Sequence, residues 1–304
     1  MEDSLKVIAP VILHGSDDFV KYHANEQFTL LLEEALLKEK SFNYPFDSLI
    51  TIARLVSADN KFRIFNWHLP RKDGTYEYFA FIQAYNNDLK KYDLFKLVDV
   101  SDSMQNPEYK SLDYLHWYGA HYYKIIQTKY GGRQYYTLLG WDGNNNESCR
   151  KIIEVLTFNS KNKPVFGANF FKLDKNEKKG KRRIIFEYSA ASSMSMKYES
   201  QFKTRGKEKK KVIMFDRLTP YEKQFTTKGK EKKKMIVFDR LTPLDPQLKG
   251  IYQFYVPETN IYDGFIFQNG KWVFMKDIDA RNNTTKKVRK KQMEYNLSPD
   301  KKKH

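Results

Sequence analysis

The chain has 304 residues, of which 40% are hydrophobic and 15% aromatic, so it can bury one large core or two ordinary ones. Its mean hydropathy is -0.72, and no apolar run approaches the ~20 residues of a membrane helix, which excludes an integral helical membrane protein. The formal net charge is +17, and a single cysteine, Cys149, excludes an internal disulfide scaffold and thiolate metal clusters.

The positive charge is concentrated in three stretches, residues 172–183, 203–243 and 281–304, which carry net charges of +5, +9 and +7. The rest of the chain is slightly acidic, with a net charge of -4. Lysine far outnumbers arginine, whose planar guanidinium suits specific phosphate and base recognition. The pattern therefore favours a compositional origin of the charge over a dedicated nucleic-acid function. The candidates for binding an anion, on nucleic acid or anionic lipid, are Lys209, Lys210, Lys211, Lys232, Lys233, Lys234, Lys286, Lys287, Lys290 and Lys291.

Residues 1–49 are predicted to form a helical segment. Apolar residues recur at helical spacing at Phe28, Leu31, Leu32, Ala35 and Leu36. Asn25 is placed to cap this helix, and Lys38 and Lys40 are placed in its last turn. The start of the chain has two acids before any base and an apolar stretch interrupted by Pro10, which does not fit an export signal and favours a cytoplasmic protein.

Residues 50–281 are predicted to form one antiparallel β body built from hairpins. Turn signals occur at Asp59-Asn60, Asp73-Gly74, Gly131-Gly132 and Asn269-Gly270, each between runs of aromatic and β-branched residues. The run YEYFAFIQAY, residues 76–85, is apolar on both faces, so we expect it to be covered on both sides. Residues 86–121 lack a sustained period and are interpreted as a long, partly helical connection and a candidate internal boundary.

A tandem duplication is the most specific feature of the sequence. YESQFKTRGKEKKKVIMFDRLTP at residues 198–220 recurs as YEKQFTTKGKEKKKMIVFDRLTP at residues 221–243, with 18 of 23 positions identical. Each copy is typical of a strand, a basic glycine-containing turn and a second strand. The copies are interpreted as a recent neutral duplication, because one sheet position cannot hold both. The alternative is an extra hairpin that presents a doubled basic turn to an anionic partner.

Motifs for chemistry are sparse. The only close histidine pair, His116 and His121, is five residues apart, which places the two rings on opposite faces of a strand. Asp142, Asn144 and Asn146 are weak candidates for a hard cation, and an Asx-rich turn is the favoured interpretation, because such a turn requires these residue types anyway. The chain has no phosphate-binding or dinucleotide-binding loop and no nucleophile elbow, so no cofactor is predicted. Carboxylates available for acid–base catalysis are Asp99, Asp102, Asp113, Asp142 and Glu154.

Three segments, residues 122–146, 151–167 and 251–283, together resemble a set of proteins from Bacteroidetes-type bacteria with no assigned function. The likeness covers roughly the C-terminal two-thirds of the chain, and its motifs describe hairpins more than a site. The resemblance implies a periplasmic or extracellular location, against the cytoplasmic alternative above, and no catalytic residue can be transferred from it. It also implies that the doubled hairpin departs from a usual single copy.

The sequence thus predicts a mainly β (α+β) protein, an antiparallel sandwich or barrel-like body with an N-terminal helical segment and a disordered basic tail at residues 282–304. The leading hypothesis for function is a non-catalytic binding or structural module of the bacterial envelope, with a protein or glycan partner. The alternatives are a carboxylate-dependent hydrolase acting near Asp142 and electrostatic attachment to nucleic acid or anionic lipid.

Overall fold

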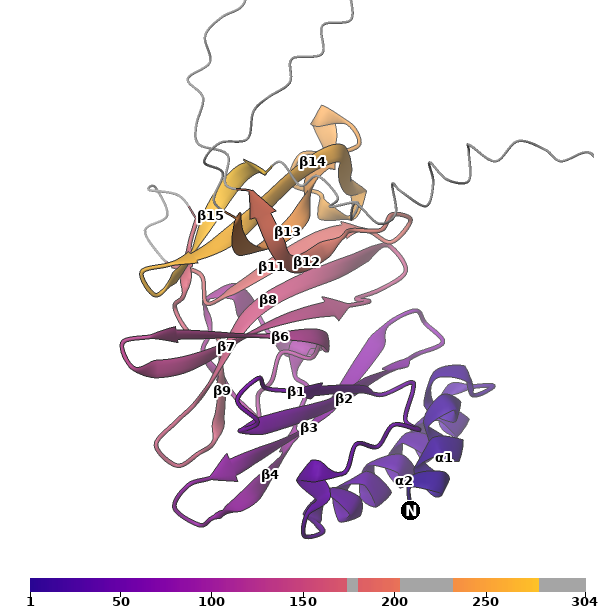
Figure 1. The fold of residues 1–304 in the computed structure, drawn as a ribbon. Coiled ribbons are helices and arrows are strands. Elements are labelled where there is room, and N and C mark those ends of the chain that lie inside the picture. Colours follow the sequence, from indigo (N-terminus) through magenta and orange to yellow (C-terminus); the bar gives the residue numbers. More distant parts are fainter. Residues whose placement is uncertain (174–179, 203–231, 279–304) are drawn as a thin grey trace, which may run out of the picture.

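The computed structural model describes residues 1–173, 180–202 and 232–278, and these residues form two long helices and three β-sheets (Figure 1). The predicted tail, residues 282–304, lies outside the described residues. The mainly antiparallel β architecture with N-terminal helices is confirmed. Within the described residues no sheet closes on itself, so the barrel-like form of the prediction is excluded in favour of stacked open sheets.

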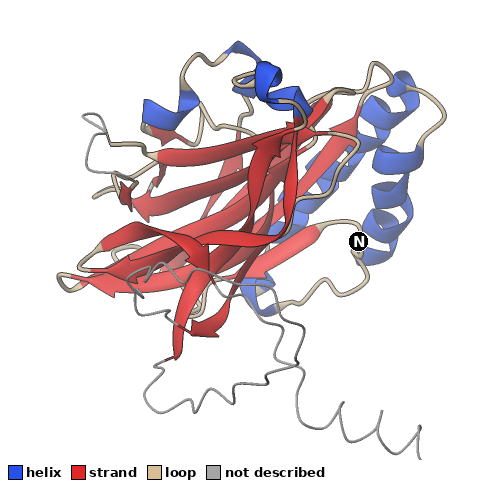
Figure 2. Cartoon of the chain, turned by 90° about the horizontal axis from the view of Figure 1, so that it is seen from above, coloured by secondary structure: helices blue, strands red, loops and turns tan. Residues whose placement is uncertain are grey.

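The N-terminal helices are α1 (Glu2–His14) and α2 (Asp18–Leu37). In α1 the buried positions Leu5, Ala9 and Ile12 follow the helical period and so lie on one face. Helix α2 begins after Asp17, whose carboxylate accepts the backbone N–H of Val20 at 3.0 Å. Both helices bury their apolar faces against the first sheet and lie on one side of the strands (Figure 2).

The predicted ends of the second helix were wrong. Asn25 lies inside α2, is buried, and accepts the indole N–H of Trp67 at 2.7 Å, so it joins the helix to the sheet and does not cap it. The last turn of α2 contains no basic residue, because the helix ends at Leu37 and Lys38 adopts an extended conformation. The spacing of apolar residues located the helix correctly. It could not distinguish the two side chains, because the oxygen of Asp or Asn can accept either a backbone N–H at a helix start, as in Asp17, or a buried side-chain donor, as in Asn25.

The N-terminal sheet has the order β1-β2-β3-β4, with all neighbours antiparallel. Its strands are β1 (Ala53–Val56), β2 (Phe62–Pro70), β3 (Tyr76–Asn86) and β4 (Lys91–Leu97). Strand β3 is covered on both faces as predicted: Phe81 packs toward the helices, whereas Tyr78, Ala80 and Ile82 pack toward the next sheet. The predicted turns at Asp59-Asn60 and Asp73-Gly74 connect its first three strands.

Residues 86–121 are less of a connection than predicted, because they contain β4, which completes the N-terminal sheet. The rest of this stretch is irregular, with short 3-10 turns at Ser101–Ser103 and Pro107–Tyr109 and a two-residue strand β5 (Leu112–Asp113). The sequence of β4, KYDLFKL, contains charged residues that interrupt the apolar–polar alternation, as is common for an edge strand. For this reason the sequence pattern did not predict the strand.

The central sheet has the order β5-β9-β8-β7-β6, and β11 also pairs with β8. Its long strands are β6 (His121–Tyr130), β7 (Arg133–Asp142) and β8 (Ser148–Phe158), and its shorter ones are β9 (Pro164–Phe166) and β11 (Arg183–Ser189). β11 pairs with residues 148–154 of β8 and β9 with residues 156–158, so the two share one edge of this strand.

The C-terminal sheet has the order β10-β15-β14-β13-β12. Its strands are β10 (Phe171–Lys172), β12 (Met196–Phe202), β13 (Lys232–Pro243), β14 (Tyr255–Gln268) and β15 (Lys271–Ile278), and only the β10–β15 pair is parallel. Its inner face packs on the central sheet through residues such as Leu139, Ile153, Ile236 and Trp272.

The duplicated segment contributes the start of its first copy, residues 198–202, and the end of its second copy, residues 232–243, to this sheet. β12 contains the start of the first copy and β13 the end of the second, and the two pair from Met196 with Phe238 to Phe202 with Lys232. Residues 203–231, which hold the rest of both copies, lie outside the described residues. The hairpin position is therefore filled once, by strands from different copies.

The layers follow one another as helices, N-terminal sheet, central sheet and C-terminal sheet, with an apolar core between each pair (Figure 1). Asn66 of β2, fully buried, joins the first two sheets, since its side chain accepts the backbone N–H of Tyr122 at 2.8 Å and donates to the Tyr122 carbonyl at 3.3 Å. In the part of the chain that the structure describes, neither helix is long and apolar enough to span a bilayer.

Candidate functional site

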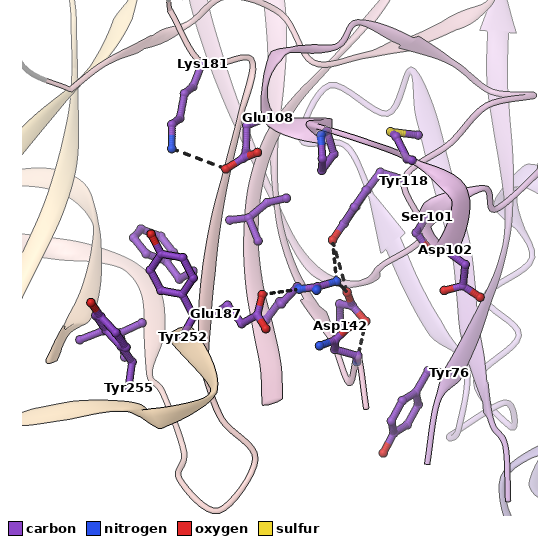
Figure 3. A pocket seen from close by; sticks show the side chains of 17 residues that line it. Tyr76, Ser101, Asp102, Glu108, Tyr118, Asp142, Lys181, Glu187, Tyr252 and Tyr255 are labelled. Atoms are coloured by element: carbon purple, nitrogen blue, oxygen red, sulfur yellow. Dashed lines mark hydrogen bonds and ion pairs between the residues drawn. The ribbon is translucent and has the colours of Figure 1, made fainter. Parts of the chain in front are cut away.

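A pocket of about 580 Å³ lies where the central sheet, the irregular segment after β4 and the C-terminal sheet meet. Its floor is formed by the end of β7 and the start of β8, and one wall by β11. The 3-10 segments near residues 101–108 and 252–254 form the rims (Figure 3). A volume of this size is typical of a small-molecule site, so this pocket, which we call the junction pocket, is the candidate functional site.

Asp142 is the central acid of the junction pocket and is only 4% exposed. It ends β7, and its Oδ1 accepts the hydroxyl of Tyr78 at 2.9 Å and the backbone N–H of Asn144 at 2.7 Å. Its Oδ2 lies 3.4 Å from both the Tyr118 hydroxyl and Nη1 of Arg150. Burial raises the pKa of Asp142, while Arg150 and the hydrogen bonds oppose that rise.

Arg150 links two carboxylates across adjacent strands. Its Nε donates to Glu187 of β11 at 3.0 Å, while Nη1 faces Asp142 of β7. Glu187 also accepts the hydroxyl of Ser148 at 2.6 Å. Because Asp142 pairs with Arg150 and Arg150 with Glu187 in the strand register, the sheet itself fixes this acid–base–acid row.

The upper rim carries a second ion pair. Lys181 Nζ lies 3.6 Å from Glu108, and both side chains are about a quarter exposed. Asp102 lies on the opposite rim, is largely exposed, and reaches Nη1 of Arg71 at 3.4 Å. The carboxylates of the junction pocket thus all face a cation within 4 Å in the described residues.

Tyrosines supply most of the aromatic surface. Tyr76 begins β3, and Tyr118 lies in the segment between β5 and β6. Tyr252 lies in the 3-10 turn before β14, and Tyr255 begins that strand (Figure 3). The Tyr252 and Tyr255 rings lie 5.1 Å apart between centroids. Tyr252 is 55% exposed, so its ring is open to a ligand at the mouth of the pocket.

A fully buried ion pair holds the pocket wall in place. Nε of Arg183 donates to Glu154 at 2.7 Å, and Nη1 of Arg183 donates to the carbonyl of Pro107, which lines the pocket, at 2.7 Å. Glu154 also accepts the hydroxyl of Tyr122, which in turn receives the indole N–H of Trp117 at 2.8 Å. This network fastens the irregular segment to β8 and β11.

The predicted cation candidates are brought only partly together. Asp142 and Asn144 both line the junction pocket, where the amide of Asn144 donates to Ser148 at 2.7 Å. Asn146 instead donates to the carbonyl of Asp73 in the β2–β3 turn. Among the described residues, no group of three or more histidine, cysteine or acidic side chains is arranged to hold a metal ion.

The other predicted acids are dispersed. Asp99 is buried and accepts backbone N–H groups of Tyr78, Ser101 and Gly119, which makes it a structural acid that shapes the turn after β4. Asp113 pairs with His116 at 2.8 Å, and Glu154 pairs with Arg183. Only Asp102 and Asp142 of the predicted set reach the junction pocket.

Only three of the ten predicted anion-binding lysines lie within the described residues. Lys232, Lys233 and Lys234 lie in β13, whereas Lys209, Lys210, Lys211, Lys286, Lys287, Lys290 and Lys291 lie outside the described residues. Residues that sequence reasoning missed are Arg150, Glu187 and the rim tyrosines. The apolar–polar alternation around Arg150 and around Glu187 indicates that each lies in a strand. It does not indicate that these two strands pair, and the pairing brings together two residues that are 37 positions apart.

Comparison with known proteins adds no assignment: neither a scan of protein-family models nor searches of curated proteins and solved structures found a match to this chain.

Proposed function

We propose that the protein is a non-catalytic binding module whose junction pocket takes a small, neutral, polyhydroxylated ligand, that is, a carbohydrate. The observation that carries the proposal is the internal pairing of the charged groups that line the pocket. Asp142 and Glu187 share Arg150, and Glu108 faces Lys181. A strongly charged ligand would have to displace one of these partners, whereas a hydroxyl can donate to a carboxylate and accept from a guanidinium at once.

The tyrosines support the same ligand class. A sugar ring has an apolar face and a polar edge, and a tyrosine offers an apolar ring with a hydroxyl at its tip. Tyr252 and Tyr255 stand at the mouth, and the hydroxyl of Tyr118 points toward the Asp142–Arg150 row (Figure 3). Following the resemblance described above, we place this binding function in the bacterial envelope.

A binding role fits the state of Asp142 better than a catalytic one does. A general acid or base must exchange its proton with the substrate, so it needs a free oxygen that faces the ligand. Both oxygens of Asp142 already meet donors, from Tyr78 and Asn144 on one side and from Tyr118 and Arg150 on the other. With these contacts Asp142 holds the side chains of the pocket wall in position.

The test is a glycan array followed by calorimetry with the saccharides that bind to the intact chain. We expect Tyr252→Ala to weaken that binding by tenfold or more, since it removes the exposed ring at the mouth. Tyr130→Ala is the matched control, because Tyr130 is similarly exposed, at 52%, but lies at the distant end of β6. Equal affinity in the two variants, or no saccharide bound at millimolar concentration, would contradict the proposal.

The raised pKa of Asp142 favours a second candidate, a carboxylate-dependent hydrolase. In that role Asp142 would carry the proton and Glu187, on the same guanidinium, would be the second carboxylate. The assay is turnover of nitrophenyl glycosides by the intact chain and by Asp142→Asn. Turnover that Asp142→Asn abolishes would establish the hydrolase, whereas binding without turnover supports the binding module.

A further inference from the structure

A second pocket, of about 340 Å³, lies between the segment that follows α2 and strands β1, β2 and β4 of the N-terminal sheet. We call it the arginine pocket, because Arg54 and Arg63 both line it. Its other walls are mainly apolar and include Leu55, Val56 and Phe65. No Asp or Glu is among the described residues that line it.

Arg63 is a buried cation, 4% exposed, without a carboxylate partner among the described residues. Its guanidinium donates to the side chain of Gln83 at 2.8 Å and to the carbonyls of Tyr44 at 2.7 Å and Ser41 at 2.6 Å. Burial lowers its pKa to about 10. Neutral oxygens offset a buried charge only in part, so this pocket retains a positive potential.

The guanidinium of Arg63 also lies against aromatic rings. Its central carbon is 4.7 Å from the centroid of Phe65 and 5.4 Å from that of Phe42. These rings hold the guanidinium plane in one orientation. Three of its N–H groups are used by the contacts above, which leaves the second hydrogens of Nη1 and Nη2 for a further acceptor.

Arg54 offers more donors. Only its Nη1 is engaged, by the carbonyls of Pro45 and Phe46 and by Asp47 at 3.1 Å. Nε and Nη2 have no partner among the described residues, and the side chain is 26% exposed. Asp47 pairs with Arg54, and the carboxylate of Glu2 also acts on its charge, whereas Arg63 has no carboxylate partner among the described residues.

We propose that the arginine pocket binds a small monocarboxylate with an apolar body. The carboxylate would accept from Nε and Nη2 of Arg54 in the two-pronged geometry that guanidinium groups favour, close to the charge of Arg63. The apolar body would lie on Leu55, Val56 and Phe65. A single negative charge matches Arg63, which has only neutral oxygen partners among the described residues, and the apolar walls disfavour a fully hydrated anion such as phosphate.

The experiment is calorimetry of the full chain with phenylacetate and with its neutral isostere phenylacetamide, at constant ionic strength. We expect phenylacetate to bind at least tenfold more tightly than the amide. Arg54→Gln should weaken phenylacetate binding by tenfold or more, and Val56→Phe should weaken it by filling the pocket from the half-exposed strand β1. Arg133→Gln, an exposed arginine in the β6–β7 hairpin, is the matched control and should bind as the intact chain does.

Melting temperatures of the variants separate loss of the site from loss of the fold. Phenylacetate should raise the melting temperature of the intact chain and of Arg133→Gln, but not that of Arg54→Gln, because only a ligand of the native state stabilises it. Equal affinity for acid and amide would overturn the proposal. So would phenylacetate binding that Arg54→Gln leaves unchanged in a variant that still melts cooperatively.

Discussion

At the scale of single residues, His68 and His121 form a pair that no spacing in the sequence announces. Their Nδ1 atoms lie 3.4 Å apart where β2 and β6 meet, so one nitrogen must donate and the other accept. Around them lie Tyr76, Tyr78 and Trp141, with Lys151 acting on His121. Burial lowers the pKa of both imidazoles, that of His68 to about 4, and the proximity of His121 to His68 and of the Lys151 ammonium to His121 adds to the effect.

This pair predicts an acid-dependent loss of stability. The pKa of His68 lies below its unfolded value of about 6.5, so the unfolded chain binds more protons and stability falls as the pH drops from about 6.5 toward 4. The loss from His68 amounts to about 3 kcal/mol. Denaturant unfolding across this range should show a shallower fall for His68→Gln, and His116→Gln, which alters an exposed histidine, should follow the intact chain. Identical slopes in both variants would refute the assignment.

The buried pair of Arg183 and Glu154 predicts a non-additive cycle. Arg183→Met leaves a carboxylate charge without its partner and should cost about 3 to 5 kcal/mol of unfolding free energy. Arg183→Met combined with Glu154→Met removes both charges and should be closer in stability to the intact chain than the single variant is. The exposed pair of Glu34 in α2 and Lys38 just after it is the control, and its coupling should not exceed about 0.5 kcal/mol. Additive single losses at the buried site would contradict this reading.

At the scale of elements, the hairpin of β12 and β13 predicts that one copy of the repeat is dispensable. Ile236 and Phe238 face the central sheet, and the first copy has the same residues at these two positions. On the outer face Met235 and Val237 correspond to Val212 and Met214, an exchange that conserves volume.

Two deletions of 23 residues test this point. Deleting 209–231 keeps Met235 and Val237 in β13, whereas deleting 221–243 supplies Val212 and Met214 in their place. We expect both variants to melt cooperatively and within a few degrees of each other. A large loss of melting temperature in either variant would show that the second copy has a structural role.

The elements also show how far the sequence could be interpreted. Each predicted hairpin turn connects the expected strands, because turn chemistry and alternation act between neighbours in the chain. Strand β4 was missed, since its edge position allows the charged residues that obscure its alternation. The start of α2 was misplaced because Asp17 and Asn25 offer the same capping chemistry, and only packing against Trp67 distinguishes them.

At the scale of the whole molecule, the junction pocket could not be derived from sequence. Asp142 was recognised as a candidate acid, but its side-chain partners lie on β3, on β8 and in the segment before β6, and the rim tyrosines Tyr252 and Tyr255 follow more than 100 residues later. The repeated stacking of sheets brings these segments together, and sheet order is not encoded in local patterns. The arginine pocket was equally hidden, since Arg54 and Arg63 come together only through the pairing of β1 with β2.

The mixed origin of the junction pocket has a consequence for its energetics. Tyr252 and Tyr255 belong to the last segment of the described chain, whereas Asp142 and Arg150 belong to the central sheet. A ligand that contacts both groups must have a higher affinity when the C-terminal sheet is packed on the central sheet than when the two sheets are separated. By reciprocity, occupancy holds that sheet in place by the same coupling free energy. A bound ligand would therefore stabilise the packing of the C-terminal sheet on the central sheet, and separation of the two sheets would release the ligand.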